Sequence, residues 1–103
     1  MNETIEKPGR TPHTPIAVNI EMWFEGSFVE RIEQAAELGF PAIELWTWRD
    51  KDLAAGAEAL NSHGMTATQF TAWGFGQEIN DPDFPVERFV EEIEAACHAA
   101  PRL

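Results

Sequence analysis

Three polar side chains recur at one interval within otherwise apolar stretches of the sequence. They are Asn19, Glu44 and Gln69, spaced 25 residues apart, and each comes two positions after an alanine. A carboxylate inside an apolar strand costs free energy unless it is paired, hydrogen-bonded or metal-bound, so Glu44 requires a partner. These side chains could orient a ligand hydroxyl or a catalytic group, or they could form purely structural hydrogen bonds or ion pairs.

The four tryptophans follow or close the short apolar runs that we predict as strands. Trp23 follows the first run, Trp46 and Trp48 close the second, and Trp73 lies just after the third. Barrel enzymes carry their active sites at the carboxyl ends of the strands, and aromatic walls with a few polar groups suit a small polar ligand. We therefore take Trp46 and Trp73 as candidate pocket walls, although the rings could simply pack against loops.

The order of elements that must position these side chains is strand then helix, three times over. Alternating aliphatic residues predict strands at residues 16–20, 42–46 and 65–71. Helical periodicity predicts helices at about 27–39, 52–64 and 86–100. Strands joined by helical crossovers should be parallel with right-handed connections, which predicts an α/β fold.

The first helix has the clearest boundaries. Ser27 stands three residues before Glu30, the spacing of a capping box, and Gly39 supplies a left-handed stop. At the end of the second helix, His63 is interpreted as a last-turn residue and not as a catalyst. In the third helix one apolar face is expected to pack, which makes Cys97 a core thiol. This face consists of Val86, Phe89, Val90, Ile93 and Cys97.

Side chains alternate across a strand, so the first two strands should have two different faces. The face toward the helices is predicted to hold Ile16, Val18, Ile20, Ile43 and Leu45. The other face would hold Ala17, Asn19, Glu21, Ala42, Glu44 and Trp46, with Ala17, Ala42 and Ala67 at corresponding strand positions. A doubly wound sheet prefers aliphatic residues on both faces, whereas a barrel can point polar groups into its mouth, so the pattern favours a barrel.

Charge and composition exclude several classes of partner. The 103 residues include 18 acidic and 7 basic side chains, and the net charge of -11 would repel nucleic acid and anionic membranes. No apolar run is long enough to span a bilayer, and residues 1–15 lack the apolar core of a signal peptide, so a cytoplasmic protein is expected. That proline-rich stretch predicts a disordered tail. The scattered histidines, His13, His63 and His98, do not suggest a metal site.

Two segments resemble a known family. Residues 19–24 (NIEMWF) and 35–44 (AAELGFPAIE) are similar to the opening of the hydroxypyruvate isomerase family, which belongs to the xylose-isomerase-like TIM barrels. Residues 69–76 (QFTAWGFG) are similar to its third-strand loop, and the resemblance extends from about Ile16 to Ala100. It implies a barrel of eight units that isomerises a small hydroxy-carbonyl compound between aldose-like and ketose-like forms by proton transfer.

The resemblance also implies what this chain lacks. A divalent metal often assists the reaction, but the family's catalytic glutamates and metal ligands lie on later strands, so no catalytic residue, metal ligand or cofactor is assigned here. Residues 16–103 then form the first three βα units of a partial (βα)8 TIM barrel. The chain is expected to be the N-terminal fragment of a sugar isomerase or epimerase, inactive alone. Its expected substrate-binding residues are Asn19, Glu44, Trp46, Gln69 and Trp73.

Two other functions compete with this interpretation. The chain could be a non-catalytic interaction module that completes a barrel by association, and its exposed strand edge could also support self-association. An endonuclease of the same superfamily acting at abasic DNA sites would need a basic groove and metal-binding histidines. The charge of -11 argues against that activity.

Overall fold

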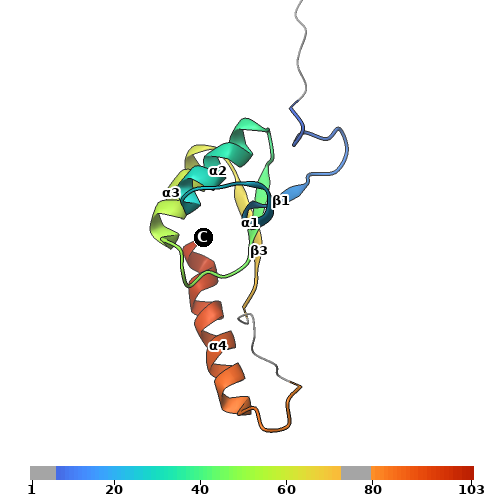
Figure 1. The fold of residues 1–103 in the computed structure, drawn as a ribbon. Helices are drawn as coiled ribbons and strands as arrows, with labels where there is room; N and C mark the ends of the chain where they lie inside the picture. Colours follow the sequence, from blue (N-terminus) through green and yellow to red (C-terminus); the bar gives the residue numbers. More distant parts are fainter. Residues whose placement is uncertain (1–6, 73–79) are drawn as a thin grey trace, which may run out of the picture.

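The sheet at the centre of the fold is parallel and has the order β1-β2-β3. The computed structural model describes residues 7–72 and 80–103 (Figure 1). Its elements are β1 (Ala17–Asn19), α1 (Ile20–Trp23), α2 (Phe28–Glu37), β2 (Ala42–Leu45), α3 (Leu53–Ser62), β3 (Thr66–Phe70), α4 (Val86–Ala99) and the 3-10 turn η1 (Ala100–Arg102). The predicted α/β fold with parallel strands is confirmed. None of the helices in these two ranges is long and apolar enough to cross a membrane.

Local capping explains why α2 and α3 begin and end where they do. The Ser27 hydroxyl accepts a hydrogen bond from Glu30 N at 3.1 Å, and Glu30 Oε1 accepts one from Ser27 N at 3.1 Å, so the predicted capping box is present. Gly39 follows α2 with a φ of 88°, a conformation that favours glycine. The Asp52 carboxylate caps α3, and His63 stands exposed at its C-terminal end as predicted.

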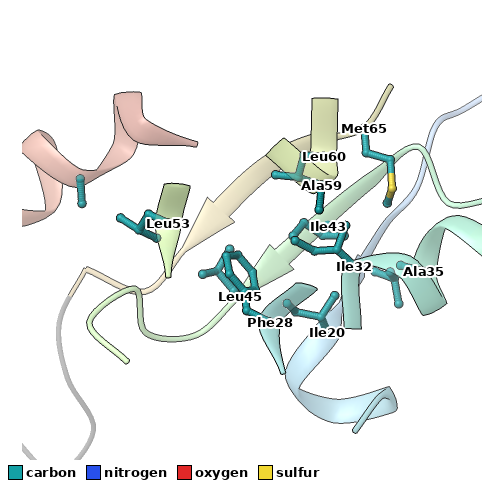
Figure 2. Close-up of a cluster of buried hydrophobic side chains, with 12 residues drawn as sticks. Ile20, Phe28, Ile32, Ala35, Ile43, Leu45, Leu53, Ala59, Leu60 and Met65 are labelled. Atoms are coloured by element: carbon teal, nitrogen blue, oxygen red, sulfur yellow. The ribbon is translucent and has the colours of Figure 1, made fainter. Parts of the chain in front are cut away.

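The hydrophobic core lies between the sheet and the helices α2 and α3 (Figure 2). Val18, Ile20, Ile43 and Leu45 are buried in it, which confirms the predicted face toward the helices for these four residues. Ile16 was also expected there, but it is 45% exposed. It precedes β1 at an edge where the described sheet has no further strand, so its side chain is only partly covered.

The predicted first strand ends earlier than its apolar pattern. Asn19 Oδ1 accepts hydrogen bonds from the backbone N–H groups of Glu21 and Met22, which starts the short helix α1 at Ile20.

Before β1, Gly9 is buried and its N–H donates to the Leu38 carbonyl at 2.7 Å. This part of the expected tail therefore packs against the end of α2.

The alanines of the three strands are not all in register. Ala17 pairs with Ala42, but Ala67 pairs with Ile43, so the expected equivalence of Ala67 is wrong. A bulge at Thr68 restores the alignment one step later, because the next pair is Glu44 with Gln69. The Thr68 hydroxyl donates to the Ile43 carbonyl at 3.2 Å beside this bulge.

Only part of the apolar face predicted for the last helix packs, because Phe89 and Ile93 are half-buried and the rest of that face is exposed. In α4, Ala96 and Ala99 are buried, while Val86 is 67% exposed and Val90 is 47% exposed. Cys97 is exposed as well, so its assignment as a core thiol is wrong. Figure 1 shows that α4 lies near the other helices and strands mainly at its C-terminal end, while its N-terminal part extends away from the sheet. In the middle of the helix, Glu92 pairs with Arg49 at 2.8 Å.

Candidate functional site

A hydrogen bond between two side chains joins the ends of β1 and β2. Asn19 Nδ2 donates to Glu44 Oε1 at 3.2 Å. The Asn19 oxygen already accepts from Glu21 N at 2.9 Å and from Met22 N at 3.2 Å, so the amide nitrogen is the end that faces Glu44. The N-cap of α1 therefore orients the donor that holds the Glu44 carboxylate.

Glu44 lies on the face of the sheet opposite the core. Its neighbours Ile43 and Leu45 are buried toward the helices, and alternation puts Glu44 on the other side, where it is only partly buried. Asn19 and Gln69 are its register partners on the two neighbouring strands. The spacing of 25 residues thus forms a row of three polar residues across the sheet, as the sequence predicted.

The Asn19–Glu44 pair opens onto a cavity of about 630 Å³ along the outer edge of β1. The remaining wall is mostly apolar and includes the aromatic rings of Trp23, Phe24 and Phe40. Cavities of this size, with an apolar wall and a few convergent polar groups, are typical of small-molecule sites. The arrangement can therefore hold a small ligand that offers both a hydrogen-bond donor and an acceptor.

Two other predicted site residues, Gln69 and Trp46, do not line this cavity. Gln69 lines a separate hollow of about 330 Å³ together with Ala100 and Leu103. Trp46 follows β2, is 38% exposed, and donates its backbone N–H to Glu21 Oε2 at 3.1 Å. Trp73 falls outside the described residues.

The other tryptophans have different roles from one another. Trp23 is 72% exposed and lines the cavity, although the sequence pattern favours Trp46 and Trp73 as pocket walls. Its position shortly after the first predicted strand was the signal in the sequence that could have selected it. Trp48 packs against the core, and the Arg49 guanidinium lies 4.6 Å from the centre of the Trp48 ring. Trp48 therefore contacts its own loop, which agrees with the alternative that the tryptophan rings pack against loops.

A charged cluster at the ends of β1 and β2 was missed by sequence reasoning. Glu21 Oε1 lies 3.1 Å from Arg31 Nη1, and Glu21 Oε2 lies 2.7 Å from Lys51 Nζ. The three residues come from α1, α2 and the loop before α3. The only signal in the sequence was Glu21 itself, an acidic residue two positions after Asn19.

The residues described here do not make a metal site. Within residues 7–72 and 80–103, no group of three or more His, Cys, Asp or Glu side chains could hold a metal ion. Glu44 alone supplies one carboxylate, and one of its oxygens is occupied by the Asn19 amide. Divalent cations such as Mg²⁺ need more oxygen ligands than this pair offers, so no step of the chemistry is assigned to a metal held by these residues.

Comparison with solved structures finds similarity to a protein of known structure. The chain is similar to a protein described as AP endonuclease, family 2, from Brucella melitensis, with 29% sequence identity and a TM-score of 0.66. The match covers 84% of this chain and 36% of that one, so this chain spans about a third of the neighbour's length. No family model and no curated protein matches the sequence. The likeness supports the xylose-isomerase-like TIM barrel superfamily, and the described elements correspond to part of such a barrel.

Proposed function

We propose that this chain forms the first three βα units of a hydroxypyruvate-isomerase-like sugar isomerase or epimerase, and that Asn19 and Glu44 bind its small hydroxy-carbonyl substrate. The observation that carries this proposal is the Asn19–Glu44 hydrogen bond at the rim of an otherwise apolar cavity. A carboxylate beside an apolar wall costs free energy unless it is hydrogen-bonded, and a polar ligand would add hydrogen bonds to the one that Asn19 supplies.

The pair still has hydrogen-bonding capacity after its own bond is made. The Asn19 amide nitrogen carries two hydrogens, and one of them is used by Glu44 Oε1. Glu44 Oε2 can accept, so the pair offers one donor and one acceptor to a ligand. A hydroxy-carbonyl compound presents the complementary groups, since its carbonyl oxygen accepts and its hydroxyl donates.

In this proposal the chain contributes binding and orientation, and it does not move the carbon-bound proton. A base for that step has to lie within hydrogen-bond reach of the substrate carbon and needs an electrophile for the enediolate. Glu44 is held by Asn19 as an orienting group, and the proton-transfer groups would come from later strands of the complete barrel. The isolated chain is therefore expected to bind the substrate weakly and to leave it unconverted.

DNA cleavage is the second candidate, because the similar barrel from Brucella melitensis carries the name of an AP endonuclease. The charge of -11 works against it, since a phosphate backbone gains affinity mainly from Lys and Arg contacts. Arg31 and Lys51 are both paired with Glu21, which further reduces their availability to phosphates.

Nuclear magnetic resonance of the ¹⁵N-labelled chain separates the two functions. Hydroxypyruvate should shift the side-chain amide signals of Asn19, whereas pyruvate, which lacks the hydroxyl, should shift them much less. Asn19→Ala should weaken hydroxypyruvate binding roughly tenfold, followed through the backbone amide signals of Glu44 and its neighbours, whereas Asn61→Ala, at an exposed position on α3, should leave binding unchanged. Equal shifts with both acids, or none with either, would refute the isomerase proposal. Binding of a duplex with an abasic site, measured by fluorescence anisotropy, would favour the nuclease.

A further inference from the structure

The carboxylate of Glu21 joins three segments of the chain at the end of the sheet. It pairs with Arg31 at 3.1 Å and with Lys51 at 2.7 Å, and it accepts a hydrogen bond from Trp46 N at 3.1 Å. Trp46 is the first residue after β2, and its N–H donates to the Glu21 carboxylate. The carboxylate thus accepts the hydrogen bond that a backbone carbonyl of a neighbouring strand would otherwise accept. Glu21 thus ties α1 to both α2 and the end of β2.

The cations of this cluster are themselves anchored on backbone carbonyls. Arg31 Nε donates to the Gly26 carbonyl at 2.9 Å, and Arg31 Nη1 lies 3.4 Å from the Ile20 carbonyl. Lys51 Nζ donates to the Thr47 carbonyl at 2.8 Å. The position of Glu21 is therefore set by the loops that follow β1 and β2.

Burial separates this cluster from an ordinary surface ion pair. The side chains of Glu21 and Lys51 are 11% and 6% exposed, so water screens their attraction poorly. The Arg49–Glu92 pair, by contrast, has side chains that are 51% and 24% exposed. Exposed pairs of this second kind contribute little to stability.

A helix as short as α1 needs outside support. It has four residues, and isolated helices of that length are not stable in water. Two backbone N–H groups of this segment, those of Glu21 and Met22, fix the oxygen of the Asn19 amide and so direct its nitrogen to Glu44. Whatever holds α1 in place also holds the donor of the candidate site.

We propose that Glu21 is the positioning residue of the Asn19–Glu44 pair, acting through α1 and held by Arg31 and Lys51. The consequence for binding rests on the proposed function. Glu21 need not touch the substrate: it keeps the Asn19 amide in the one orientation that presents a donor beside the Glu44 carboxylate. Pre-organisation of this kind by supporting residues is what makes a polar site precise.

The test compares two equal changes of charge at two ion pairs. Glu21→Gln keeps the shape of the side chain but removes its charge, and Glu92→Gln makes the same change in the exposed pair. In Glu21→Gln the Asn19 side-chain amide signals should move toward those of a free amide, and the Trp46 backbone N–H should exchange with solvent roughly tenfold faster. Lys51→Met should reproduce both effects, and Glu92→Gln should show neither. Unchanged Asn19 signals in folded Glu21→Gln would overturn the proposal.

A double-mutant cycle distinguishes positioning from general destabilisation. Glu21→Gln should weaken hydroxypyruvate binding several-fold in the otherwise unchanged chain, and by much less when Asn19 is already alanine, because the two residues act through one amide. Equal losses in both backgrounds would refute positioning. If the unchanged chain fails to bind hydroxypyruvate, the proposed function is wrong, while the amide signals and the Trp46 exchange rate still decide the role of Glu21.

Discussion

Asn19 Nδ2 lies 3.2 Å from Glu44 Oε1, although the two residues stand 25 positions apart in the chain. The contact depends on the parallel register of β1 and β2, which sets Asn19 directly opposite Glu44. It also depends on α1, whose backbone N–H groups occupy the Asn19 oxygen. One asparagine therefore serves as a helix cap and as the partner of a carboxylate.

Asn19→Asp should separate these two roles. Aspartate caps helices as well as asparagine does, so α1 keeps its cap, but a second carboxylate would face Glu44. We expect a loss of about 1 kcal/mol in the free energy of unfolding at neutral pH. Like-charge repulsion raises the carboxyl pKa in the folded variant, so the deficit should shrink as the pH falls through that pKa.

Urea denaturation at neutral and acidic pH measures this effect. Asn19→Ala is the matched variant, because it removes both the cap and the donor and should cost about 2 kcal/mol at either pH. An Asn19→Asp protein as stable as the unchanged chain at neutral pH would show that the amide does not contact Glu44 in solution.

Thr68→Val tests the bulge that brings Gln69 into register with Glu44. In the unchanged chain the Ile43 carbonyl accepts a hydrogen bond from the Thr68 hydroxyl at 3.2 Å. Valine keeps the branched shape of threonine but cannot donate this hydrogen bond. We expect a loss of about 1 kcal/mol in the free energy of unfolding. Thr66→Val, on the same exposed strand, should change it by less than about 0.5 kcal/mol. Equal effects at the two positions would contradict the role given to the Thr68 hydroxyl.

Gly56→Ala should destabilise the chain although alanine favours helix. A Cβ at this position of α3 would lie 2.8 Å from Phe28 Cδ2 and closer still to Cε2, and Phe28 is buried in the core. Overpacking costs about 1–3 kcal/mol and the helical gain is about 1 kcal/mol, so a net loss of roughly 1 kcal/mol is expected. Thermal unfolding measures it. Phe28→Leu should cost less in the Gly56→Ala background than alone, and strictly additive losses would mean that the two residues do not touch.

The pKa of Glu30 should lie below the ordinary value of a glutamate. The main cause is the Ser27 backbone N–H that donates to the Glu30 carboxylate, and the second is the Ser27 side chain. Because the folded pKa is lowered, the stabilisation is present above the ordinary carboxyl pKa and is lost as the pH falls through the folded pKa. A carbon-detected titration of the folded chain, compared with the chain in urea, measures the difference. Ser27→Ala should move the folded pKa part of the way back, and identical folded and unfolded values would exclude the capping box in solution.

Ile16→Lys should reduce self-association if the open edge of β1 is the contact surface. Ile16 is 45% exposed beside a strand edge, and natural proteins protect such edges with charged side chains. Sedimentation velocity at several concentrations should show less oligomer for this variant than for the unchanged chain. Val86→Lys adds the same charge to an apolar position on α4 that is more exposed, at 67%, and should have little effect. A larger effect of Val86→Lys would move the contact surface to α4.

The sequence by itself determined the features that depend on neighbouring residues. The capping box of Ser27 and Glu30, the stop at Gly39 and the alternation that buries Ile43 beside Glu44 all act within a few residues. Interactions at this range follow from composition and spacing alone. The equal spacing of Asn19, Glu44 and Gln69 also predicted a contact between distant residues. βα units of equal length put corresponding strand positions opposite one another in a parallel sheet.

Only the tertiary structure decided which side chains meet across the units. The bulge at Thr68 shifted Ala67 out of register, and the direction of α4 left Cys97 exposed. The path of the loops brought Lys51 to Glu21, while Gln69 lines a hollow apart from the Asn19–Glu44 cavity. The physical reason is that ion pairs, bulges and cavities depend on the relative placement of elements far apart in the chain, whereas caps and periodic faces are set by the local backbone.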